Sequence, residues 1–151
     1  MADFVSEPLP LPRMGGDVSR ADLVFHGVDH SGPSFEALVF LNNPTATADT
    51  GRERAQGYVG SFFIFGHGGC AGDVGHCEVP SERRPFDWRP PHQLTPATRL
   101  VIVTEALRGL VEAGEETVMV SVVPIATRPP AETEGEILQI ERVSLALYVW
   151  P

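Results

Sequence analysis

Residues 34–41, Ser-Phe-Glu-Ala-Leu-Val-Phe-Leu, carry the clearest secondary-structure signal in this chain of 151 residues. Every second position is apolar, which is the period of a β-strand with one buried face. Leu38 and Phe40 make part of the other face apolar as well, so we expect this strand to be covered on both sides. The sequence Asn-Asn-Pro at 42–44 ends the strand, because proline cannot donate to the ladder and asparagine favours turns.

Other segments of similar length predict further strands, separated by loops that are rich in Gly (15) and Pro (14). Residues 58–65 form the next strong candidate, with an unusually aromatic run of Phe62, Phe63 and Phe65. Short β-branched or aromatic runs bounded by turn residues are typical of strands. The remaining strand candidates cover residues 21–26, 99–103, 117–125 and 137–149.

One short helix interrupts the strands. We expect Thr104 to be its N-cap, residues 105–112 to form its body and Gly114 to end it. About seven short strands with one short helix predict a mainly β protein, specifically an antiparallel β-sandwich. Residues 1–20 are rich in Pro and Gly and are expected to form an extended N-terminal arm, while residues 21–151 form a single sandwich domain.

The charge of the chain excludes several functions. The formal net charge is −9, and all 11 basic residues are arginines. A nucleic-acid partner requires a basic surface, and an anionic membrane would repel this chain. The absence of lysine excludes Schiff-base chemistry and a Walker-type phosphate loop. We therefore expect neither a nucleic acid nor a membrane as partner.

The first residues predict the location of the protein. They contain no basic segment followed by an apolar one, which is the pattern of a secretory signal. No apolar run reaches the roughly 18 residues of a membrane span. The expectation is a cytoplasmic protein, or one that is exported together with a partner.

The segment with the clearest potential for chemistry is residues 65–77, which hold both cysteines, two of the five histidines and an aspartate. Three interpretations stay open. Cys70 and Cys77 can form a disulfide, which stabilises a fold by roughly 2–3 kcal/mol through loop closure. Alternatively, His67, Cys70, His76 and Cys77 hold a metal such as Cu(I) or zinc, although their spacing matches no zinc-finger pattern. In the third interpretation the glycines only turn the backbone and the histidines are polar surface groups.

A series of short motifs runs in order through roughly residues 20–125. It consists of Phe25-His26-Gly27-Val28, His30-Ser31-Gly32-Pro33-Ser34-Phe35-Glu36, Val39-Phe40-Leu41-Asn42, Gly60-Ser61-Phe62, Phe65-Gly66-His67-Gly68, Gly75-His76-Cys77, Val79-Pro80, Pro85-Phe86-Asp87, Arg89-Pro90-Pro91-His92, Leu94-Thr95-Pro96 and Val103-Thr104-Glu105-Ala106-Leu107. This series resembles the C-terminal region of bacterial tyrosinase-family proteins.

In that family, which includes polyphenol oxidases and hemocyanins, a helical domain holds two coppers through six histidines, and a β-sandwich domain packs beside it. This chain has five histidines in all, so it cannot supply the six-histidine centre itself. The resemblance therefore implies an accessory or cover domain of a type-3 copper oxidase acting on phenols or catechols. The copper would lie on the partner, a tyrosinase-like copper-binding domain or subunit, and this chain would have no catalytic residue of its own.

We expect four aromatic side chains to face that partner: Phe62, Phe63, Phe65 and Trp88. Exposed aromatic residues are typical of docking surfaces. An alternative for residues 58–65 is a central strand whose aromatic side chains are buried between the sheet and the loops. The alternative function is a small copper carrier that uses the loop from His67 to Cys77, with Cu(I) bound in this chain.

Overall fold

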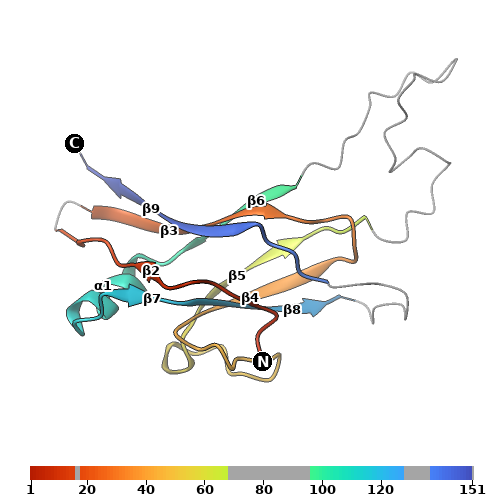
Figure 1. Ribbon diagram of the computed structural model, residues 1–151, viewed down its shortest axis with the longest axis horizontal. Helices are drawn as coiled ribbons and strands as arrows, with labels where there is room; N and C mark the ends of the chain where they lie inside the picture. Colours follow the sequence, from red (N-terminus) through yellow and green to blue (C-terminus); the bar gives the residue numbers. More distant parts are fainter. Residues whose placement is uncertain (16–17, 68–95, 128–136, 151) are drawn as a thin grey trace, which may run out of the picture.

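The computed structural model describes residues 1–15, 18–67, 96–127 and 137–150. Two antiparallel β-sheets lie face to face, as Figure 1 shows. One sheet has the strand order β1 (Phe4–Val5), β8 (Val120–Ala126), β4 (Phe35–Leu41) and β5 (Tyr58–Ile64). The other has the order β6 (Ala97–Ile102), β3 (Val18–Val28) and β9 (Arg142–Val149). The prediction of a mainly β, antiparallel sandwich with one short helix is confirmed.

The smaller elements lie at the margins of the two sheets. The N-terminal segment pairs through β1 with β8, and through β2 (Leu9–Pro10) with β7 (Thr117–Val118). A short 3-10 helix, η1 (Arg54–Gln56), precedes β5. The predicted boundary between an arm over 1–20 and a domain over 21–151 stays a prediction, although β3 already begins at Val18.

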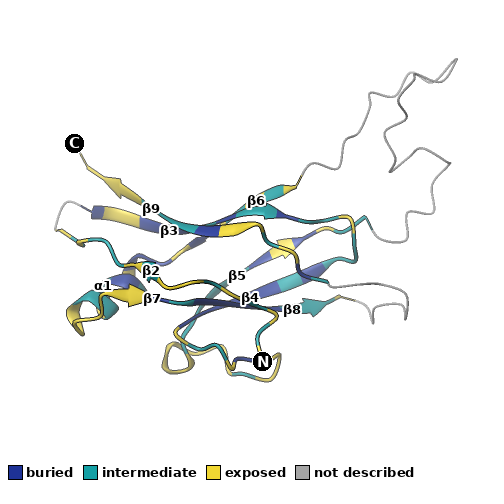
Figure 2. Ribbon diagram, viewed as in Figure 1, coloured by how far each residue is buried: buried dark blue, intermediate teal, exposed yellow. Residues whose placement is uncertain are grey.

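The strand β4 is buried on both faces, as its sequence predicted. Its residues from Phe35 to Leu41 alternate between the core and the opposite side of the sheet, and all except Glu36 are buried. On the side away from the core, Leu38 and Phe40 form a second cluster with Ala46, which belongs to the loop that follows β4. Figure 2 shows β4 largely in the colour of buried residues. The main core between the sheets includes Leu23, Phe25, Ala37, Val39, Phe62, Ile64, Val101 and Val122.

The helix α1 (Thr104–Glu112) begins one residue earlier than predicted. Thr104 is its first residue, and its hydroxyl makes no capping bond but accepts a hydrogen bond of 2.9 Å from the backbone N–H of Ala21. The side chain therefore ties the helix to β3. Gly114 follows the helix with a φ of 84°, the left-handed conformation that glycine adopts easily after a helix. Within the described segments, no helix is long and apolar enough to cross a membrane.

One predicted strand is divided in the structure, and another is shortened. The strand expected over 117–125 is divided at Met119, whose N–H donates to the Asn42 side chain while its carbonyl accepts from the Asn42 N–H, both at 2.9 Å. The strand expected over 137–149 begins only at Arg142. There Arg142 pairs with His26 of β3, and Gly27 follows with a φ of 64°, so the regular ladder ends.

Candidate functional site

The sheet β6–β3–β9 carries an apolar surface on the side away from the core. Its register places Asp22 between Ile102 and Ala146, and Val24 between Leu100 and Ser144. Since successive side chains of a strand point to opposite faces, these residues point away from buried Leu23. This surface is named the outer apolar face, and its apolar members are Val24, Leu100, Ile102, Ala146 and Tyr148.

The outer apolar face is open to solvent. The exposed fraction is 58% for Ile102, 48% for Leu100 and 46% for Tyr148. The other sheet, by contrast, buries its outward-pointing Leu38 and Phe40 under a loop. Antiparallel sheets that face water normally alternate apolar and polar residues, and contiguous exposed apolar side chains mark interaction sites. This face is therefore a candidate interaction surface.

An ion pair lies within the outer apolar face. The Arg20 guanidinium donates two hydrogen bonds, of 2.7 and 2.8 Å, to the two carboxylate oxygens of Asp22. The hydrogen bond to Asp22 raises the pKa of Arg20, so the guanidinium stays charged. Although Asp22 points away from the core, its side chain is fully covered, and the Arg20 guanidinium lies 5.5 Å from the Tyr148 ring centre. The face thus contains a fixed charged pair rather than a free charge.

The phenylalanines that we expected to face a partner point to opposite sides of the sheet that contains β5. Phe62 points into the core, where its ring centre lies 4.9 Å from that of Phe25, so this side chain is not available on the surface. Phe63 and Phe65 point outward and are 65% and 78% exposed. Trp88, the fourth residue of that prediction, lies outside the described residues. The aromatic surface at this strand therefore consists of Phe63 and Phe65.

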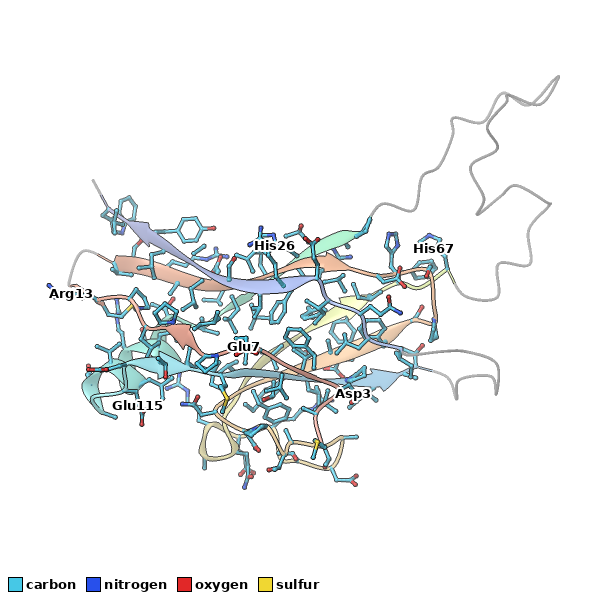
Figure 3. The ribbon with its side chains drawn as sticks, in the orientation of Figure 1. Asp3, Glu7, Arg13, His26, His67 and Glu115 are labelled. Carbon is cyan, nitrogen blue, oxygen red and sulfur yellow. The ribbon has the colours of Figure 1, made fainter. Side chains whose placement is uncertain are left out.

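Two histidines that are distant in sequence meet where β5 ends. The Nδ1 atoms of His30 and His67 are 3.2 Å apart, and the His67 N–H donates to the His30 carbonyl at 2.9 Å. Both imidazoles are half-buried, and the edge of one ring faces the other. Phe65 packs next to His67 with a ring-centre separation of 5.8 Å. Figure 3 shows His67 at this end of the sandwich and His26 on the layer that contains β3.

The structure describes one of the four residues in the predicted metal site of His67, Cys70, His76 and Cys77. His67 lies in the structure as described above, whereas Cys70, His76 and Cys77 lie outside the described residues, and with them the competing disulfide. Among the residues that are described, no three His, Cys, Asp or Glu side chains gather in a position to hold a metal ion. The predicted four-ligand site and the disulfide both stay predictions.

Sequence reasoning missed the outer apolar face and the contact of His30 with His67. A signal for the face was available in Leu100-Val101-Ile102, where apolar residues occupy both faces of one strand, as they do in residues 34–41. No local signal connects His30 to His67, because loops of different strands bring them together.

The fold is similar to part of a known oxidase. The structure of a latent aurone synthase (polyphenol oxidase) from a natural source superposes on 97% of this chain with a TM-score of 0.52 and 17% sequence identity. At this identity the likeness shows a shared fold alone. The chain spans 24% of the length of that protein. Neither a family profile nor a curated protein matches the sequence.

Proposed function

We propose, from a fold shared with a quarter of a polyphenol oxidase, that this chain is an accessory domain of a tyrosinase-like copper oxidase. It docks on a copper-bearing body that lies outside these residues, and there it stabilises that body or controls access to its coppers. The observation that carries this proposal is the outer apolar face, which leaves three large apolar side chains in solvent. The motif series in the sequence supports the same family.

Burying the outer apolar face supplies the driving force for docking. Each square ångström of apolar surface removed from water contributes about 25 cal/mol. The ion pair of Arg20 and Asp22 tolerates burial better than a single charge, because each group already has its partner. The remaining Arg20 N–H groups then select a partner surface that offers hydrogen-bond acceptors. Since the chain carries a net charge of −9, basic residues around that surface increase the rate of association.

The exposed pair Phe63 and Phe65 has a second role in this proposal. In the family that the sequence resembles, the sandwich places an aromatic side chain near the entrance to the coppers. Phe65 is 78% exposed beyond the end of β5, so it can enter a groove of the partner without unfolding the strand. Substituting it changes access of phenols to the coppers, while substituting the outer apolar face changes affinity.

The test measures association with the copper-bearing domain of a polyphenol oxidase prepared without its own β-sandwich. Sedimentation velocity should detect a complex at about 10 μM of each protein or below. Leu100→Glu combined with Ile102→Glu should weaken the complex at least tenfold, because docking would bury two carboxylates without partners. Val5→Glu alters another exposed apolar residue, on β1, and should leave affinity unchanged.

Two results contradict the proposal. One is the absence of any complex at ten times that concentration. The other is phenol oxidation by this chain alone when it is supplied with copper, because an accessory domain does no such chemistry. Circular dichroism of each variant verifies that a lost complex does not reflect a lost fold.

The second candidate function is the small copper carrier that uses the loop from His67 to Cys77. The contact between His67 and His30 favours it, because an imidazole held in place is a better ligand than a free one. A carrier of this kind binds one Cu(I) per chain. Unchanged Cu(I) affinity after Cys70→Ser plus Cys77→Ser would exclude the thiolates from that role.

A further inference from the structure

Hydrogen bonds from the backbone hold His67 next to His30. The His67 N–H donates to the His30 carbonyl at 2.9 Å, and the preceding Gly66 N–H donates to Ser34 Oγ at 3.0 Å. A Cβ atom at Gly66 would collide with the Gly32 carbonyl oxygen and with Pro33. Glycine is therefore required at 66 for the end of β5 to approach the loop that carries His30.

Hydrogen bonds made by Asp29 also fix the loop that carries His30. Asp29 accepts hydrogen bonds from the N–H and the hydroxyl of Ser31, at 3.1 and 2.8 Å. The Asp29 N–H donates to the carbonyl of Gln139 at 3.0 Å. The backbone at His30 and the backbone at His67 are thus each held by hydrogen bonds to neighbouring segments.

The separation of the two imidazole nitrogens matches that of two ligands on one metal ion. Nitrogens that each lie about 2.0–2.1 Å from a tetrahedral ion are roughly 3.3 Å apart. The Nδ1 atoms of His30 and His67 are 3.2 Å apart. Small rotations of the two rings would direct both Nδ1 lone pairs at one ion, which would lie beside the line that joins the two nitrogens. Without metal, one Nδ1–H can donate to the other Nδ1, and His67 Nδ1 also lies 3.3 Å from the His30 carbonyl oxygen. A tautomer that carries its proton on Nε2 presents the Nδ1 lone pair to a metal ion.

We infer that His30 and His67 form a two-imidazole site for a divalent transition metal, Cu(II) or Zn(II), at the end of β5. Imidazole nitrogen suits both ions, and Cu(II) binds such a site more tightly than Zn(II). This inference does not depend on docking to an oxidase, and it differs from the carrier hypothesis because it requires His30 and no cysteine.

The experiment titrates the full chain with Cu(II) chloride and, separately, with Zn(II) chloride. Electron paramagnetic resonance should show one bound Cu(II) per chain with hyperfine splitting from two nitrogens. Zn(II) should shift the imidazole nitrogen resonances of His30 and His67 in the unmodified protein, a readout that needs no variant. His30→Gln and His67→Gln should each lower Cu(II) affinity at least tenfold.

Two control variants distinguish this site from others. His26→Gln removes an imidazole that hydrogen-bonds Ser144 elsewhere on the sandwich, and it should change affinity less than twofold. Cys70→Ser plus Cys77→Ser should also change it less than twofold. The inference is overturned if His30→Gln and His67→Gln both leave affinity unchanged, if the cysteine variant abolishes binding while His30→Gln does not, or if Zn(II) leaves both histidine resonances unmoved.

Discussion

Replacing Phe62 and Phe63 by alanine, one at a time, should cause very different losses of stability although the two side chains are identical and adjacent. Phe62 is 5% exposed and packs against Phe25 in the core, whereas Phe63 is 65% exposed. Truncating a buried phenylalanine costs about 3–5 kcal/mol. Phe62→Ala should lie in the upper half of that range, because it also removes a ring pair that contributes about 0.5–1.5 kcal/mol.

The expected cost of Phe63→Ala follows from the same geometry. Complete burial of such a side chain contributes about 1.5–3 kcal/mol, and Phe63 buries roughly a third of its surface, so the loss should be about 0.5–1 kcal/mol. With a urea slope near 2 kcal/mol/M, the unfolding midpoint should fall by roughly 2 M for Phe62→Ala and by at most about 0.5 M for Phe63→Ala.

Urea unfolding followed by circular dichroism measures both midpoints, and equal slopes verify that the same transition is being compared. Equal shifts for the two variants, or a larger shift for Phe63→Ala, would show that the two faces of β5 are assigned wrongly. In that case the aromatic docking surface proposed for Phe63 and Phe65 would also be wrong.

The remaining predictions concern the ion pairs and the histidine contact. Hydrogen bonds from Arg52 lower the pKa of Glu36. The ion pair therefore contributes its full stability at pH values above the ordinary pKa of glutamate, and this contribution is lost as the pH falls through the lowered pKa. Arg52→Ala should therefore lower the urea midpoint at neutral pH and have no effect in acid; a difference independent of pH would contradict this. Arg20→Met should destabilise the protein more than the double variant Arg20→Met plus Asp22→Asn, because the single change leaves a covered carboxylate without its cation. Thermal unfolding of the two variants tests this, and a lower melting temperature for the double variant would refute it. Gly66→Ala should lower both the melting temperature and the Cu(II) affinity, since the added methyl group separates the two histidine loops; unchanged affinity would contradict this.

Much of the fold was predictable because its signals are local. The period of two in residues 34–41 and the turn at 42–44 predicted β4 and its end, and Gly114 predicted the end of α1. The bounds that were wrong depend on distant partners. Met119 interrupts the strand predicted over 117–125 because Asn42, 77 residues away, takes both of its backbone hydrogen bonds.

The candidate site was less predictable than the fold. Phe63 and Phe65 were expected on a surface and are exposed there, but Phe62 was expected beside them and lies in the core. The pattern of residues 58–65 is apolar at both parities, so it does not say which face of the strand meets the other sheet. Pairing of Phe62 with Ala37 in β4 decides this, and pairing is a property of two strands rather than one.

Composition and local periodicity were sufficient to establish the fold class, the short helix, the acidic charge and the lack of a six-histidine centre in this chain. The three-dimensional fold was needed to show that Leu100, Val24 and Ser144 form one row across three strands, and that His30 lies against His67, 37 residues along the chain. Strand register and loop contacts result from hydrogen bonds and core packing between remote segments, and a single segment's residues do not specify them.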